Sequence, residues 1–102
     1  MDFIYLLESY NEFETIYKIG FSKNVDKRLK QHKTSNPNEL NMIKKFQTNH
    51  KRKIETSLHN LYVHKKIDGE WFKLDYNDIL NFDKLCNNLE KSFDCLNSKN
   101  FL

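Results

Sequence analysis

The sequence predicts a small α+β domain: a three-stranded antiparallel sheet flanked by helices, in the order β-β-α-β-α with an added C-terminal helix. Two strand-like runs lie close together near the start, and helical and strand-like periodicity alternate after them. A chain of 102 residues has room for one hydrophobic core. We therefore expect residues 1–102 to form a single domain, with its core within about 2–74.

The first two strands are expected at residues 3–7 and 15–21. The earlier run is continuously apolar, which favours a strand covered on both faces. The short polar connection between the runs favours an antiparallel hairpin. Gly20 is expected to close the second strand, at a point where the backbone turns or where another group approaches it closely.

A helix is expected over residues 24–33 with Asn24 as its N-cap, followed by a break at 34–38. Residues 40–48 are then typical of a third strand, with Met42 and Phe46 on one face and Ile43 on the other. A second helix is expected to begin at position 49 or 50 and to run to about 64. Its expected buried stripe is Ile54, Leu58, Leu61 and Tyr62.

The last helix is expected over about 77–93, and the end of the chain, residues 94–102, is expected to fray. Its apolar residues recur at helical spacing: Ile79, Phe82, Leu85, Cys86, Leu89 and Phe93. We interpret this stripe as core packing instead of a partner surface. Cys86 and Cys95 are too few for a disulfide framework, and their spacing does not suggest a metal site. No apolar stretch approaches the roughly 20 residues of a membrane span. We therefore expect an intracellular protein, cytoplasmic or nuclear, with no membrane partner.

The net charge of +3 hides a strong asymmetry along the chain. Residues 18–53 contain eleven positive and two negative side chains, for a net charge of +9, whereas the rest has six positive and twelve negative, for −6. Segregated positive charge attracts and steers a polyanion. This asymmetry favours nucleic acid as the partner, against the alternative of a merely solvated basic face.

Four short motifs occur in order along the chain. Phe-Ile-Tyr stands at residues 3–5 and Lys-Ile-Gly at 18–20, with Arg28 and His32 following at eight and twelve residues past the glycine. Ile-Glu-Thr-Ser-Leu-His at 54–59 contains Glu55, and Gly-Glu-Trp-Phe stands at 69–72. Over residues 2–74 this pattern resembles the GIY-YIG nuclease superfamily, in a divergent branch that has Lys-Ile-Gly as its second triplet and carries the Gly-Glu-Trp-Phe motif.

The resemblance implies a metal-dependent endonuclease that hydrolyses phosphodiester bonds in DNA, with RNA as a second possible substrate. The implied catalytic residues are Tyr5, Tyr17, Lys18, Arg28, His32 and Glu55. Glu55 would hold one divalent cation, Mg²⁺ or Mn²⁺, and Arg28 would bind the scissile phosphate.

Tyr5 would orient or deprotonate the attacking water, and Tyr17 and His32 would help to position water and phosphate. Because a phenol has a pKa of about 10, Lys18 and the cation are expected to lower the pKa of Tyr5.

The side chains expected to contact nucleic acid are nine cations and one histidine: Lys23, Lys27, Lys30, Lys33, Lys44, Lys45, Lys51, Arg52, Lys53 and His59. For His59, a bond to a neighbouring loop is an equal alternative. The chain also departs from the superfamily's pattern. Phe3 replaces a glycine, Lys18 replaces a tyrosine, and residues 70–72 stand where several members have an asparagine. These departures bear on the identity of the general base.

Two other functions fit the same sequence. A module of the same fold could bind nucleic acid while cleaving it weakly or not at all. Alternatively, a small interaction protein could use the basic face to meet an acidic protein. The nuclease and the nucleic-acid-binding module are both expected to lose affinity for nucleic acid steeply as the salt concentration rises.

Overall fold

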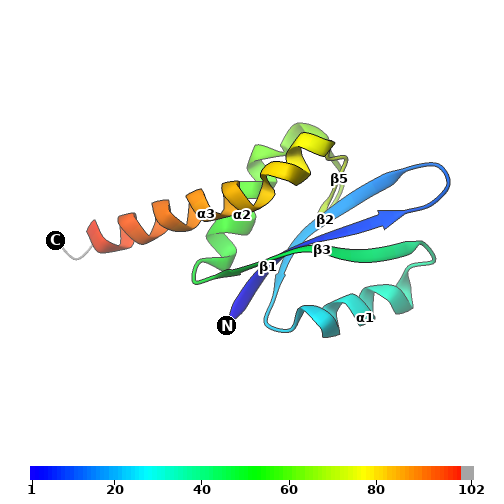
Figure 1. Ribbon diagram of the computed structural model, residues 1–102, viewed down its shortest axis with the longest axis horizontal. Helices are drawn as coiled ribbons and strands as arrows, with labels where there is room; N and C mark the ends of the chain where they lie inside the picture. Colours follow the sequence, from blue (N-terminus) through cyan, green and yellow to red (C-terminus); the bar gives the residue numbers. More distant parts are fainter. Residues whose placement is uncertain (100–102) are drawn as a thin grey trace.

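The computed structural model describes residues 1–99, and an antiparallel sheet lies at its centre (Figure 1). β1 (Asp2–Tyr10) pairs with β2 (Thr15–Ser22) on one side and with β3 (Glu39–Thr48) on the other. Two short strands, β4 (Lys66–Asp68) and β5 (Trp71–Phe72), extend the sheet beyond β2 in the order β3-β1-β2-β5-β4. The predicted α+β class is confirmed, but within the described residues the sheet has five strands instead of the expected three. β4 and β5 are too short to show a strand periodicity.

The central strand β1 is covered on both faces, as its apolar run predicts. Residues 4–7 are all buried, with Ile4 and Leu6 facing one side of the sheet and Tyr5 and Leu7 the other. β2 continues two residues past Gly20, so the expected end of that strand is corrected to Ser22. Gly20 lies opposite Tyr5 in the β1–β2 register.

A bulge in β3 overturns the prediction that Phe46 lies on the same face as Met42. In the register with β1, Leu6 pairs with Lys44 and Leu7 with Met42, so one residue of β3 is left without a partner. A β-bulge of this kind reverses the alternation of side chains beyond it. Ile43 and Phe46 therefore pack on the same side of the sheet, and Met42 packs on the other.

Helices cover both faces of the sheet (Figure 1). α1 (Val25–Ser35) lies on one face, and its N-cap is Asn24, whose side-chain oxygen accepts a hydrogen bond from the Lys27 N–H at 3.0 Å. α2 (Lys51–Leu61) and α3 (Tyr76–Lys99) lie on the other face, and a 3₁₀ turn (Val63–Lys65) follows α2. α2 thus ends three residues earlier than predicted. Leu61 stands at that end and is 57% exposed, so it does not belong to the buried stripe.

The sheet separates two apolar clusters. The larger lies under α2 and α3, and its buried members are Ile4, Leu6, Ile19, Ile54, Leu58, Tyr62, Phe72, Leu74, Phe82 and Cys86. The smaller lies under α1 and contains Tyr5, Leu7, Val25 and Leu40. The apolar stripe predicted for the last helix is confirmed as core packing. The region 94–102 was expected to fray, but α3 continues to Lys99; residues 100–102 lie outside the described part.

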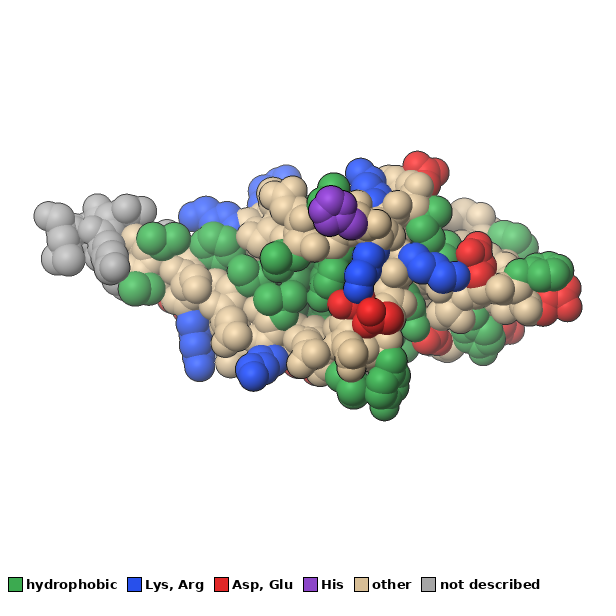
Figure 2. Space-filling view, turned by 90° about the horizontal axis from the view of Figure 1, so that it is seen from above, with side chains coloured by type: hydrophobic (Ala, Val, Ile, Leu, Met, Phe, Trp, Pro, Cys, Tyr) green, Lys and Arg blue, Asp and Glu red, His purple; other side chains and the backbone are tan. Residues whose placement is uncertain are grey.

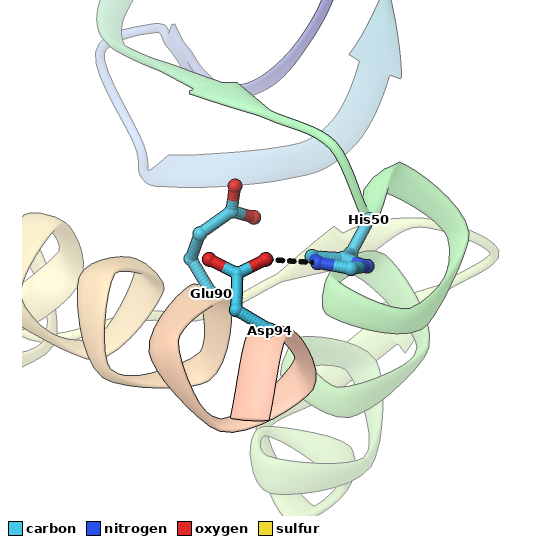
Figure 3. A group of neighbouring side chains, drawn as sticks. All are labelled: His50, Glu90 and Asp94. Carbon is cyan, nitrogen blue, oxygen red and sulfur yellow. Dashed lines mark hydrogen bonds and ion pairs between the residues drawn. The ribbon is translucent and has the colours of Figure 1, made fainter. Parts of the chain in front are cut away.

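α3 is fastened to the beginning of α2 by two carboxylates (Figure 3). The Glu90 carboxylate accepts hydrogen bonds from the Thr48 hydroxyl and, at 3.1 Å, from the backbone N–H of Asn49. Asp94 lies 2.7 Å from Nε2 of His50. The potential ligand atoms of His50, Glu90 and Asp94 lie within 4.8 Å of one another, but each of these groups already has a partner in the protein. The cluster therefore joins two helices.

The face covered by α2 and α3 carries basic and acidic side chains interspersed, with apolar side chains along the projecting end of α3 (Figure 2). Within residues 1–99, no helix combines the length and apolar character needed to cross a bilayer.

Candidate active site

A polar pocket of about 260 Å³ opens at the outer edge of β2. β5 pairs only with Tyr17 and Lys18, so the edge of β2 from Gly20 onward has no neighbouring strand. α1 and α2, on opposite faces, both reach this edge. The residues that line the pocket are Tyr5, Lys18, Gly20, Phe21, Arg28, Arg52, Glu55 and Glu70. Four predicted catalytic residues, separated by up to 50 positions, are therefore brought together.

Tyr5 lies across the backbone of Gly20, which forms the floor of the pocket. A Cβ built on Gly20 would lie 2.5 Å from the Tyr5 hydroxyl oxygen and 2.7 Å from the ring carbon that bears it. Only a residue without a side chain leaves room for the phenol in this position. The close approach predicted at Gly20 is confirmed, and the approaching group is a predicted catalytic side chain.

Burial raises the pKa of Tyr5 to about 12, and the negative charges of Glu70 and Glu55 act in the same direction. The Arg28 guanidinium opposes them by favouring the phenolate. Burial thus dominates in the free protein, and the expected lowering of this pKa by Lys18 together with a bound cation stays a prediction. Tyr5 is a protonated phenol at neutral pH.

His32 is the nearest side-chain partner of Tyr5. Its Nε2 atom lies 3.4 Å from the Tyr5 hydroxyl oxygen, at the long limit of a hydrogen bond. Burial lowers the pKa of His32 below its ordinary value of 6.5, and the charges of Lys18 and Arg28 lower it further. The ring is therefore neutral at pH 7, and its unprotonated nitrogen can accept a hydrogen bond from the phenol.

Two carboxylates, Glu55 from α2 and Glu70 from the turn before β5, meet in the pocket. Burial raises the pKa of Glu55, and the charge of Glu70 raises it further, while His59, Arg52 and Lys18 lower it. Carboxylate oxygens are the donors that Mg²⁺ and Mn²⁺ prefer, and Mg²⁺ is usually held by one or two of them. The donor set of the pocket thus fits a hard divalent cation.

Glu70 is a pocket residue that the sequence prediction missed. Its carbonyl oxygen accepts a hydrogen bond from the Ile19 N–H at 3.3 Å, and its carboxylate lies 3.4 Å from the Lys18 ammonium. The same ammonium stands 5.7 Å from the centre of the Trp71 ring. The available signal was the Gly-Glu-Trp-Phe motif at 69–72, since it contains the next carboxylate of the sequence after Asp68.

Tyr17 and His59 are not pocket-lining residues. Tyr17 packs on the cluster under α2 and α3, and its pKa is raised first by burial and then by the neighbouring Glu8. His59 Nε2 lies 3.0 Å from the Ile19 carbonyl oxygen, and its ring meets Phe72 edge-on. The alternative of an internal bond therefore describes His59, although its partner is strand β2 and not a loop.

The predicted nucleic-acid contacts divide into two groups. Some cations are already paired within the protein: Lys44 with Asp83 at 2.9 Å, and Lys51 with Asp2 at 3.2 Å. The exposed group consists of Lys23, Lys27, Lys30, Lys33, Lys45, Arg52 and Lys53.

Exposed cations lie on both sides of the pocket. Lys23 and Lys27 line a second hollow, which shares Arg28 with the pocket. On the other side, Arg52 lies over the Phe21 ring at 5.4 Å, and Lys53 over the Phe93 ring at 5.7 Å. A basic surface thus runs from the beginning of α1, across the pocket, to the beginning of α2.

The fold and the pocket define a small α+β domain with a polar pocket at one edge of its sheet. The chain belongs to the T5orf172 domain family, which it matches over residues 2–87. This domain is found in phage and bacterial proteins associated with HNH- and GIY-YIG-like endonucleases. No curated protein and no solved structure matches the chain.

Proposed function

We propose that the protein is a metal-dependent endonuclease of the GIY-YIG type, which hydrolyses phosphodiester bonds in DNA. The observation that carries the proposal is the single pocket in which Tyr5, Arg28 and Glu55 meet from β1, α1 and α2. These groups supply a proton-transfer site, a cation for phosphate and a carboxylate for metal.

Arg28 binds the scissile phosphate. Its side chain is exposed at the pocket wall, beside the basic surface formed by Lys23 and Lys27. Charge-assisted hydrogen bonds from a guanidinium to phosphate oxygens strengthen as negative charge develops on them. The same positive charge favours the phenolate of Tyr5, so Arg28 assists both phosphate binding and proton transfer.

Glu55 holds Mg²⁺ or Mn²⁺. When bound, the cation supplies charge stabilisation at the phosphate and at the leaving oxygen. Tyr5 orients the attacking water through its hydroxyl oxygen and takes a proton from it. Neutral His32 receives the phenolic proton at Nε2. This relay makes the general base a pair, in which the buried phenol does not need to be ionised beforehand.

One observation favours a second function, that of a nucleic-acid-binding module without rapid cleavage. The pKa of about 12 at Tyr5 means that the phenol is not ionised in the free protein at neutral pH. A protein with this pocket could bind DNA on the same basic surface and fail at the proton-transfer step.

The deciding experiment compares wild type with Glu55→Gln on supercoiled DNA, with Mg²⁺ or Mn²⁺ and after chelation. Glu12→Gln is the matched control, because Glu12 is exposed in the β1–β2 turn and its substitution removes the same charge. We expect metal-dependent nicking by wild type and the control, and a loss of nicking of about a hundredfold or more in Glu55→Gln.

Fluorescence anisotropy at low salt should show that all three proteins bind DNA. Equal background nicking with intact DNA binding would favour the binding module, and retention of an acidic protein without DNA binding would contradict both. An RNA strand in the same assay compares the two substrates.

A further inference from the structure

The pocket contains a second acidic side chain to which the proposed reaction gives no role. We infer that Glu70 is a metal ligand, so that the divalent cation is held by two carboxylates, Glu55 and Glu70. This inference rests on the proposed function, since it concerns the same cation.

The position of Glu70 is fixed by backbone interactions. Gly69 adopts a positive φ of 52°, which lets the chain reverse between β4 and β5. The Glu70 carbonyl oxygen then accepts the Ile19 N–H, and Trp71 pairs with Lys18. The main chain of Glu70 is thereby tied to β2, at the strand edge where the pocket opens.

The ion pair between Lys18 and Glu70 is suited to exchange. The two charged groups are 3.4 Å apart, and the Glu70 side chain is 44% exposed. The carboxylate is therefore open to solvent and to an incoming cation, whereas the Lys18 side chain is 18% exposed. A divalent cation can therefore replace the ammonium beside the Glu70 carboxylate, while the stem of Lys18 remains beside Trp71.

The charge balance of the pocket also favours Glu70. Lys18, Arg28 and Arg52 bring three positive charges to the walls. Glu55 alone would leave a divalent cation among a clear excess of like charge. Glu70 is the strongest source of negative potential on Glu55, so the two carboxylates form the acidic side of the pocket. Two carboxylates lie within the range that Mg²⁺ ordinarily uses.

Binding of Mn²⁺ tests the inference without reference to cleavage. Electron paramagnetic resonance reports free Mn²⁺, and Tb³⁺ luminescence sensitised by Trp71, the single tryptophan of the chain, reports occupancy near the pocket. We expect Glu70→Gln and Glu55→Gln each to weaken Mn²⁺ binding about tenfold or more, and Glu12→Gln to leave it unchanged. Lys18→Met should bind Mn²⁺ more tightly than wild type, because the competing ammonium is gone.

The outcomes separate this inference from the proposed function. If Mn²⁺ affinity falls in Glu55→Gln but stays at the wild-type value in Glu70→Gln, the cation is held by Glu55 alone and the inference is overturned. If wild type binds no Mn²⁺, the cation of the proposed function is overturned as well. Should Glu70→Gln fail to fold, Lys18→Met decides, since unchanged or weaker binding in that variant contradicts the exchange.

Discussion

At the scale of single residues, the pocket depends on one close approach. The Tyr5 phenol lies across the Gly20 backbone and can point toward His32 only because position 20 has no side chain. The second glycine of the chain is different in kind. Gly69 has open space around its α-carbon, and it is required for its positive φ alone.

Gly20→Ala should therefore impair the pocket more than the fold. The new methyl would meet the Tyr5 hydroxyl at 2.5 Å, so the phenol must move away from the pocket floor. Overpacking of this kind costs about 1–3 kcal/mol of stability. We expect a lowered melting temperature, retained DNA binding, and a loss of nicking comparable to that of Tyr5→Phe.

Gly69→Ala is the control for that experiment. Its cost is the left-handed backbone conformation, about 1 kcal/mol, without contact with Tyr5. Nicking should survive in Gly69→Ala if assayed well below its melting temperature. Full nicking activity in Gly20→Ala would mean that the position of the Tyr5 hydroxyl does not matter for the reaction.

How far the site could be predicted from sequence varies residue by residue. Arg28 and His32 share one face of α1, and their fixed spacing from Gly20 carries them toward Tyr5. Tyr17 and Lys18 could not both reach one pocket, because consecutive side chains of a strand face opposite sides. The two-residue repeat of a strand therefore predicts that only one of these two side chains lines the pocket. Glu70 could not be placed from sequence, since its position depends on the pairing of two-residue β5 with β2.

At the scale of elements, the three long strands and three helices follow from apolar periodicity, and the errors have local causes. The bulge at position 43 leaves no mark on the hydrophobic pattern, yet it places Met42 and Phe46 on opposite faces of the sheet. β4 and β5 are held by backbone pairing instead of an apolar run. The predicted end of α3 falls short because the apolar stripe ends at Phe93, whereas the helix continues to Lys99.

The contact between α3 and the beginning of α2 makes a prediction at this scale. Glu90 places a carboxylate beside the N-terminus of α2, where it accepts from the Asn49 N–H and the Thr48 hydroxyl. Glu90→Gln removes a charge-assisted bond and a favourable interaction with the helix dipole. We expect a loss of about 1–3 kcal/mol in the free energy of unfolding, measured by urea denaturation.

Asp94→Asn provides the comparison, because the Asp94 side chain is 59% exposed and solvent screens its carboxylate. Its effect should be smaller than that of Glu90→Gln. Equal or reversed effects would show that the dipole at the beginning of α2 does not need the Glu90 carboxylate.

At the scale of the whole molecule, the charge asymmetry of the sequence is redistributed by the fold. Residues 18–53 carry the positive excess, but α3 returns acidic side chains to part of it, as Asp83 does to Lys44. Among the cations that remain exposed, Lys23 and Lys27 lie on one side of the pocket and Arg52 on the other. The surface available to a polyanion is thus smaller than the sequence count implies, and part of it borders the pocket.

This redistribution predicts which lysines govern the salt dependence of DNA binding. Each phosphate contact contributes a slope of about −0.9 to the logarithm of affinity against the logarithm of salt concentration. The double variant Lys23→Gln, Lys27→Gln should bind DNA more weakly and reduce the slope by about two. Lys44→Gln should leave the slope unchanged, because that ammonium is already paired with Asp83 at 2.9 Å. Anisotropy titrations over a range of salt concentrations measure both slopes.

Equal reductions of the slope in the Lys23, Lys27 double variant and in Lys44→Gln would mean that DNA reaches Lys44 and displaces Asp83. The interface would then extend over the end of the sheet opposite β4. No change in either would place the bound phosphates at Arg28 and Arg52, within the pocket itself.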